Sequence, residues 1–69
     1  MRRSPNHIRK WRTENGFKLE DVAGLSGFSA GFVSRLERGQ RGVSPKTRVL
    51  IARRLGAKVS DLFEPEPLD

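Results

Sequence analysis

The chain has 69 residues, a formal net charge of +6 and a hydrophobic content of 35%. A chain this short forms one domain with a small core, because it buries only about 60% of the surface that it exposes when unfolded. It contains no cysteine, which excludes disulfides and cysteine-based zinc sites, and no apolar run of about 18 residues, which excludes a membrane-spanning helix.

The positive charge is unevenly distributed along the chain. All 14 Lys and Arg lie in residues 1–58 with only four of the eight acidic residues, so this segment carries +10 and residues 59–69 carry −4. A basic body suits a polyanion such as DNA, since phosphate contacts supply much of DNA-binding affinity. The alternative is a solvated basic surface that only keeps the protein soluble, and composition alone does not separate the two. The basic start of the chain has no apolar segment behind it, so it is not a secretory signal, and we expect a cytoplasmic protein.

The first predicted helix covers residues 5–15. Ser4-Pro5 reads as a cap followed by proline at the first helical position, and Gly16 is expected to end the helix. Ile8 and Trp11 lie three positions apart and form its apolar face. An exposed tryptophan can also stack on a nucleic-acid base, but this helical spacing favours a place in the core for Trp11.

Two short helices, over residues 18–26 and 29–38, are predicted on either side of Gly27. Gly27 lies where the chain must turn, and a residue without a Cβ takes a positive φ there at little cost. Ser29 then offers its hydroxyl to the free N–H groups at the start of the next helix. A turn of this kind sets the second helix across the first, which is the geometry with which a helix enters the DNA major groove.

Two further helices complete the predicted fold. One covers residues 45–55, between a second cap-and-proline start at Ser44 and a stop at Gly56, and a short one covers residues 59–63. Five helices without a strand pattern predict an all-α fold. The acidic, proline-containing residues 64–69 are expected to be disordered, which leaves residues 1–63 as the domain. The positions expected to share one core are Trp11, Leu25, Phe28, Val33, Leu36, Ile51, Ala52, Leu55, Leu62 and Phe63.

Five short motifs follow one another along the chain: VAGLSGFS, VSRLERG, SPKT, IARRLG and DLFE. In this order and spacing they resemble the lambda-repressor-like family of the Cro/repressor, or xenobiotic-response-element, type over residues 8–64. The resemblance implies a compact five-helix DNA-binding domain whose helix-turn-helix is formed by the second and third helices. It also implies that the third helix, about Ser29 to Arg38, is the recognition helix in the major groove.

By this resemblance, the base-reading positions are Ala30, Gly31, Ser34 and Arg35. Arg35 can hold O6 and N7 of a guanine with two hydrogen bonds, Ser34 can add one hydrogen bond, and Ala30 can touch a thymine methyl. Ala30 and Gly31 depart from the family, which often carries Gln, Arg or Ser at these positions. Direct readout of the sequence therefore falls mainly on Arg35.

The same resemblance implies contacts to the DNA backbone from side chains around the recognition helix: Lys18, Ser29, Phe32, Arg38, Arg41, Lys46 and Thr47. Leu19 stands where many relatives have Gln, and Lys18 beside it can reach a phosphate instead. Phe32 has two interpretations, either against the sugar-phosphate wall or half-buried against the second helix. Weaker assignments concern Arg2 and Arg3, on an arm that can enter a minor groove, and Arg48, Arg53 and Arg54, as solvated charges.

In the family, an Arg at the position of Arg12 pairs with a Glu at the position of Glu37, across the first and third helices. The planar guanidinium can hold a carboxylate with two hydrogen bonds. Such a pair would lock the recognition helix to the rest of the domain. The alternative is two unrelated surface charges.

No motif in the sequence indicates an enzyme. His7 is the only histidine and has no nucleophilic partner in a recognisable motif, while Glu20 and Asp21 open a helix, where they favour its dipole. We therefore expect no catalytic residue, no cofactor and no metal site.

The interpretation that follows is a repressor-type, sequence-specific transcriptional regulator of bacterial or phage origin that binds double-stranded DNA. Because one such module buries little surface, we expect a homodimer on an inverted repeat. The dimer is expected to form through the helix over residues 59–63 and the face of the helix over residues 45–55 that carries Leu50. We expect no membrane and no small-molecule ligand. The alternative is an antitoxin or adaptor that binds a protein partner, with DNA binding secondary, which the lack of hydrogen-bonding side chains at Ala30 and Gly31 favours.

Overall fold

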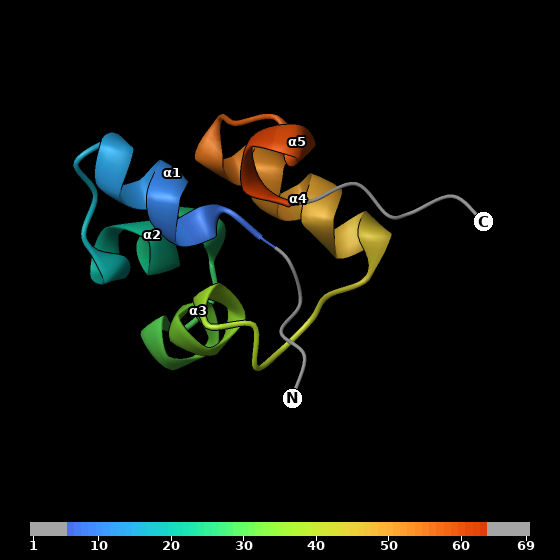
Figure 1. Ribbon diagram of the computed structural model, residues 1–69, viewed down its shortest axis with the longest axis horizontal. Coiled ribbons are helices and arrows are strands. Elements are labelled where there is room, and N and C mark those ends of the chain that lie inside the picture. The colour runs from blue at the N-terminus through green and yellow to red at the C-terminus, as the bar shows by residue number, and fades with distance from the viewer. Residues whose placement is uncertain (1–5, 64–69) are drawn as a thin grey trace.

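The computed structural model describes residues 6–63, which form five helices packed around one core (Figure 1). The helices are α1 (Ile8–Glu14), α2 (Leu19–Ser26), α3 (Ala30–Glu37), α4 (Pro45–Leu55) and α5 (Val59–Leu62). Within these residues no strand is present, so the predicted all-α class is confirmed. The expectations for Ser4-Pro5, for the arm with Arg2 and Arg3, and for residues 64–69 lie outside the described residues.

The predicted serine caps lie at the starts of α3 and α4. The Ser29 hydroxyl accepts a hydrogen bond from the Phe32 N–H at 3.1 Å, and the Ser44 hydroxyl accepts one from the Thr47 N–H at 3.3 Å. Each of these bonds satisfies one of the free donors that a helix start leaves. Gly27 ends α2 with φ +83°, a value that favours glycine, so the chain turns there as its sequence predicts.

The predicted start of the first helix is wrong. The helix begins at Ile8 rather than at residue 5, because Asn6 is held elsewhere. Asn6 forms an isolated antiparallel bridge with Phe63, and the next N–H, of His7, donates to the carbonyl of Leu62 at 2.7 Å. The Asn6 side-chain amide also donates to the carbonyl of Leu36 at 2.9 Å. These contacts with distant parts of the chain override the local helix signal.

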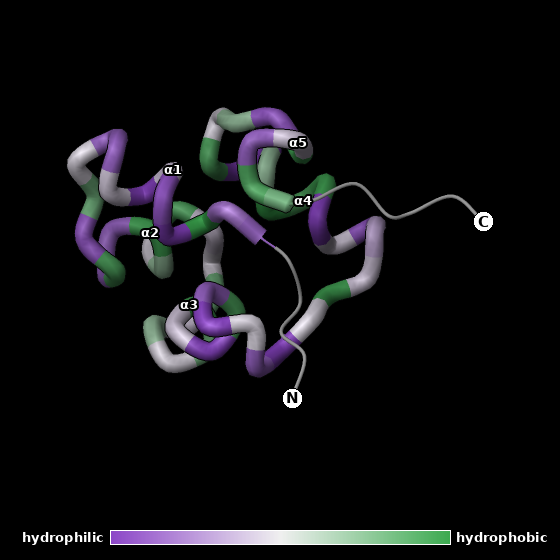
Figure 2. The backbone as a smooth tube through the Cα atoms, viewed as in Figure 1, coloured by the Kyte–Doolittle hydropathy of each residue, from purple (hydrophilic) through white to green (hydrophobic). Residues whose placement is uncertain are grey.

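The core forms where α2 packs against α3 and α4, and where α5 packs against α1 and α4. Hydrophilic and hydrophobic segments alternate along the helices, as expected when each helix buries one side (Figure 2). The prediction that Leu25 belongs to the core is wrong, since its side chain is 47% exposed. Trp11 and Phe28 are half-buried and pack at the edge of the core. The buried apolar residues are Ile8, Val22, Ala23, Val33, Leu36, Ile51, Ala52, Leu55, Leu62 and Phe63.

Arg54 of α4 is exposed, as expected of a solvated charge, but it also closes the end of α2, a role that the sequence did not predict. Its Nη1 donates to the carbonyl of Ser26 at 2.7 Å, and it lies so close to Gly27 that an added Cβ there would stand 2.8 Å from it. The last turn of α2 has no basic residue of its own, so Arg54 supplies the positive charge that a helix C-terminus favours. Arg48 departs from the prediction, because it is half-buried with its guanidinium 5.5 Å from the centre of the Phe63 ring.

None of the helices in the described part of the chain has the length and apolar character needed to cross a membrane.

Candidate nucleic-acid interface

Helix α3 has a buried side and an open side. Val33 and Leu36 are each 3% exposed and face the core. Successive residues of an α-helix are about 100° apart around its axis, so the side opposite Val33 and Leu36 carries Gly31 and Arg35. Both of these residues are exposed. Ser34 and Arg38 fall on the same open side by this spacing, while Ala30 and Phe32 lie at its flanks.

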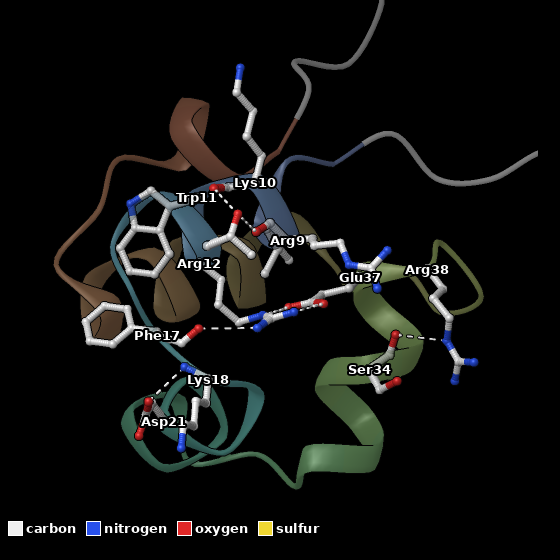
Figure 3. Close-up of polar contacts among 12 residues, drawn as sticks. Arg9, Lys10, Trp11, Arg12, Phe17, Lys18, Asp21, Ser34, Glu37 and Arg38 are labelled. Carbon is white, nitrogen blue, oxygen red and sulfur yellow. Dashed lines mark hydrogen bonds and ion pairs between the residues drawn. The ribbon is translucent and has the colours of Figure 1, made fainter.

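The buried side of α3 is joined to α1 by an ion pair between Arg12 and Glu37. Arg12 Nε donates to Glu37 Oε2 at 2.6 Å and Arg12 Nη2 donates to Glu37 Oε1 at 3.1 Å, so the guanidinium holds the carboxylate with two bonds (Figure 3). Arg12 Nη1 also donates to the carbonyl of Phe17 at 3.3 Å. The side chains are 15% and 5% exposed, respectively. The pair that the family resemblance implied is therefore present, and it connects α1, α3 and the segment before α2.

The hydrogen bonds that Arg12 donates to Glu37, more than the charge of that carboxylate, raise the pKa of Arg12 above the ordinary arginine value, against the lowering effect of burial. A raised pKa in the folded state means that the stabilisation is complete below the ordinary arginine pKa and is lost only as the pH rises through the raised value. The contribution of Arg12 to this link therefore does not vary with pH near neutrality.

The open side of α3 combines small and basic side chains. Gly31 has open space around it, since an added Cβ would meet no atom within 4 Å, and Ala30 and Ser34 are half-buried. Arg38 Nε donates to the carbonyl of Ser34 at 3.3 Å, so its guanidinium stays near the end of the helix (Figure 3). Arg35 is exposed and makes no hydrogen bond or ion pair through its side chain within residues 6–63, so its five donors are available to a ligand.

Beside this open side, three planar groups contact one another in series. The rings of Phe28 and Phe32 stack with centroids 4.6 Å apart and planes 23° apart. The guanidinium carbon of Arg41 lies 4.9 Å from the centre of the Phe32 ring. Phe32 is thus half-buried and stacked on a residue of the turn between α2 and α3. The sequence did not predict this stack, although two aromatic residues four positions apart, at residues 28 and 32, were a signal for it.

The other predicted backbone-contacting residues lie at helix starts. Lys18 precedes α2, and its N–H donates to Asp21 Oδ2 at 2.8 Å, while its side chain is exposed. Lys46 and Thr47 lie in the first turn of α4, where the Ser44 hydroxyl donates to Thr47 Oγ1 at 3.0 Å. The structure therefore brings Ser29, Phe32, Arg38 and Arg41 together around α3, whereas the first turn of α4 lies apart from α3, beyond the connecting loop (Figure 1).

Among residues 6–63, no group of three or more His, Cys, Asp or Glu side chains is placed to hold a metal ion. What the open side of α3 offers is hydrogen-bond donors and positive charge. Such a surface suits binding to an anionic, hydrogen-bonding partner.

A family model described as a helix-turn-helix domain matches residues 6–63. The HTH-type transcriptional regulator DdrOP3 of Deinococcus deserti is 39% identical over 57 residues, which are 83% of this chain. The match covers 44% of DdrOP3, so the chain spans less than half the length of that relative. The uncharacterised HTH-type transcriptional regulator y4dJ of Sinorhizobium fredii is 35% identical over 60 residues, which are 87% of this chain and 78% of y4dJ.

Two solved structures are similar in both fold and sequence. The restriction-modification controller protein C.AhdI from Aeromonas hydrophila superposes with a TM-score of 0.72 and 37% identity, covering 83% of this chain and 86% of that one. The clp gene regulator ClgR from C. glutamicum superposes with a TM-score of 0.70 and 37% identity, covering 78% and 70%. These two regulators share the helical arrangement that carries α3.

Proposed function

The chain belongs to the helix-turn-helix domain family, a family of DNA-binding proteins rather than enzymes, and from this premise we propose that it is a transcriptional repressor that binds double-stranded DNA through α3. The observation that carries the proposal is the division of α3 into two sides. Its buried side is fixed by Val33, Leu36 and the Arg12–Glu37 pair, while its open side presents Arg35, whose side chain has no partner among residues 6–63. A helix held in this way is the form that recognition helices take in the major groove.

We assign base contacts to Ala30, Gly31, Ser34 and Arg35. Arg35 is the principal one, because a bidentate bond to guanine discriminates against other bases by about 1–3 kcal/mol. Ser34 adds one hydrogen bond. Ala30 and Gly31 have no side-chain hydrogen-bonding group, and their small size only lets a base come close to the helix. The geometry of the open side supports this ranking, since Gly31 leaves room for a base edge and Arg35 is exposed.

We assign contacts with the DNA backbone to Lys18, Ser29, Phe32, Arg38, Arg41, Lys46 and Thr47. Phosphate contacts of this kind fix the register of a protein on the duplex without reading its sequence. The exposed charges of Lys18, Arg38, Arg41 and Lys46 support the assignment. The two lysines lie at helix starts, where free backbone N–H groups favour an anion.

We propose a homodimer on an inverted repeat, since a single module buries only about 600–1,000 Å² on DNA. Three large apolar side chains are exposed on α4 and α5: Val49 at 47%, Leu50 at 38% and Val59 at 37%. We infer that a second copy covers these side chains in the dimer. Repression then follows from occupancy of the operator. The named relatives come from bacteria, and a regulator of bacterial DNA works in the cytoplasm.

Selection from random duplex DNA tests the function. We expect enrichment of an inverted repeat, and binding to the selected duplex should weaken with salt. If each subunit neutralises about four phosphates, the slope of log K against log salt is about −3 to −4 per subunit. No enrichment, together with a flat salt response, would contradict DNA binding.

A matched pair of leucine variants tests the dimer. Leu50→Asp should abolish self-association in sedimentation velocity experiments and weaken binding to the full repeat more than binding to a half-site. Leu25→Asp is the control, because Leu25 is also an exposed leucine, at 47%, but lies on α2. If Leu25→Asp disrupts association and Leu50→Asp does not, the proposed face is wrong.

A second candidate function is an antitoxin or adaptor that binds a protein partner, with DNA binding secondary. It is favoured by Ala30 and Gly31, whose side chains supply no hydrogen bond at two of the four base-reading positions. The selection experiment separates the two functions. An adaptor would bind DNA weakly and without preference, whereas a regulator enriches one sequence.

A further inference from the structure

We propose that Phe32 acts on DNA through Arg41, as a positioning residue that holds the Arg41 guanidinium against a phosphate beside the recognition helix. The inference rests on the proposed DNA-binding function and deepens it. It separates the roles of two residues that the family resemblance placed together among the backbone contacts. Arg41 binds the phosphate, and Phe32 sets where Arg41 is.

The loop after α3 is held on both sides of Arg41. Before it, Gly39 N–H donates to the carbonyl of Leu36 at 3.1 Å and Gln40 N–H donates to the carbonyl of Arg35 at 2.9 Å, so the loop starts against the last turn of α3. After it, Val43 is half-buried against the core. The backbone near Arg41 is therefore constrained, and what remains to be ordered is the long side chain.

Phe32 orders that side chain. The guanidinium carbon of Arg41 lies 4.9 Å from the centre of the Phe32 ring, within the range of a cation–π contact. Phe32 is in turn steadied by Phe28, whose ring is 4.6 Å away and nearly parallel. Since Phe32 belongs to the first turn of α3, this series ties Arg41 to the start of the recognition helix.

A guanidinium that rests on an aromatic ring keeps its hydrogen-bonding edge free. A cation–π contact uses none of the five N–H donors of the guanidinium, so they stay available for an anion. Arg41 itself is exposed. A phosphate that meets this edge accepts two parallel bonds, and the entropy cost of fixing a long side chain has been met before binding. Phe32 is half-buried with its ring against Phe28 and Arg41, so in this inference it supports the backbone contact through Arg41, in place of the direct contact assigned above.

The test is a double-mutant cycle on the selected duplex with Phe32→Leu, Arg41→Ala and the double variant. We expect Arg41→Ala to weaken binding about tenfold and to reduce the salt slope by about 0.9, the value for one phosphate. Phe32→Leu should weaken binding about two- to fivefold, the equivalent of an exposed cation–π contact. In the Arg41→Ala background, Phe32→Leu should have no further effect. In the chain that keeps Arg41, Phe32→Tyr, which keeps the ring, should bind as the wild type does.

Urea unfolding of each variant separates positioning from folding, since affinities are compared only for the folded fraction. Additive losses in the cycle, or failure of Phe32→Tyr to bind as the wild type does, would overturn the inference. Wild-type affinity and salt slope in Arg41→Ala would also overturn it while leaving DNA binding intact. If the wild-type chain binds no DNA at all, the proposed function fails first and the inference fails with it.

Discussion

The two sides of α3 differ in what determines them. On the buried side, Val33 and Leu36 pack in the core and Glu37 is held by Arg12 with two hydrogen bonds, so every group has a fixed partner. On the open side, a Cβ added at Gly31 would meet nothing within 4 Å outside its own helix, and Arg35 has no side-chain partner in the described residues. The contacts on the buried side thus determine the position of α3. Gly31 and Arg35 on the open side make no contact that holds the helix, so these positions can vary to suit a ligand.

The largest effect should come from breaking the link behind the helix. Glu37→Gln leaves the Arg12 guanidinium facing an amide in a site where the two side chains are 15% and 5% exposed. Removing one charge of a mostly buried pair costs about 3 kcal/mol, at the lower end of the usual range because Arg12 keeps some contact with water. Urea unfolding at neutral pH measures this loss. Glu14→Gln, at an exposed position of α1, should change the free energy of unfolding by less than about 0.5 kcal/mol. Equal values for the two variants would contradict a structural role for the pair.

A change on the open side should affect DNA and leave the fold intact. Arg35→Ala should lose about 1–3 kcal/mol of binding energy on the selected duplex and relax the preference at one base pair. Its unfolding midpoint should stay near that of the wild type. Lys10→Ala removes the same charge from α1, where the side chain points away from α3 (Figure 3), and serves as the control for net charge. A loss in Arg35→Ala that is the same on selected and random DNA would show that Arg35 contacts phosphate rather than bases.

The smallest effect is expected from replacing a glycine of α3 and a glycine of α2 by alanine. Gly31 on α3 and Gly24 on α2 both have open space around them and no positive φ, so replacement by alanine should stabilise either helix by up to about 1 kcal/mol. Thermal unfolding should show the same gain for both variants. Only Gly31→Ala should also alter affinity for the selected duplex, because the new methyl group stands where a base edge approaches. A change in affinity for Gly24→Ala of the same size would argue against this placement.

Local signals predicted most helix ends, and two of the failures have the same cause. The end of α2 and the starts of α3 and α4 could be predicted because Gly27, Ser29 and Ser44 act on their immediate neighbours. The start of α1 was missed because Asn6 is fixed by residues far along the chain. Arg54 was missed for the same reason, since the carbonyl that it binds belongs to Ser26, 28 positions earlier. Contacts between distant residues leave no mark on local spacing.

The core and the candidate site were predictable to different degrees. Leu25 was misplaced because several of its neighbours in the short helix α2, Val22 and Ala23 among them, already fill the side that faces the core. The Arg12–Glu37 pair was predicted only through the family resemblance, because two charges 25 positions apart have no spacing rule of their own. The stack of Phe28 and Phe32 was not predicted although their spacing was a signal for it, whereas the contact of Arg41 with Phe32 has no such signal, since it requires the loop after α3 to fold back onto that helix.

The bridge between Asn6 and Phe63 has a consequence for how the domain can be rebuilt. Paired backbones lie about 5 Å apart, so a linker of a few residues can connect residue 63 back to residue 6. Closing so short a gap costs little entropy, and the exposed loop around Gly42 offers a place to open the chain. A circular permutant with its new ends at Gly42 would keep all five helices, and would put the two ends of the polypeptide within the loop that carries Arg41, directly after that residue.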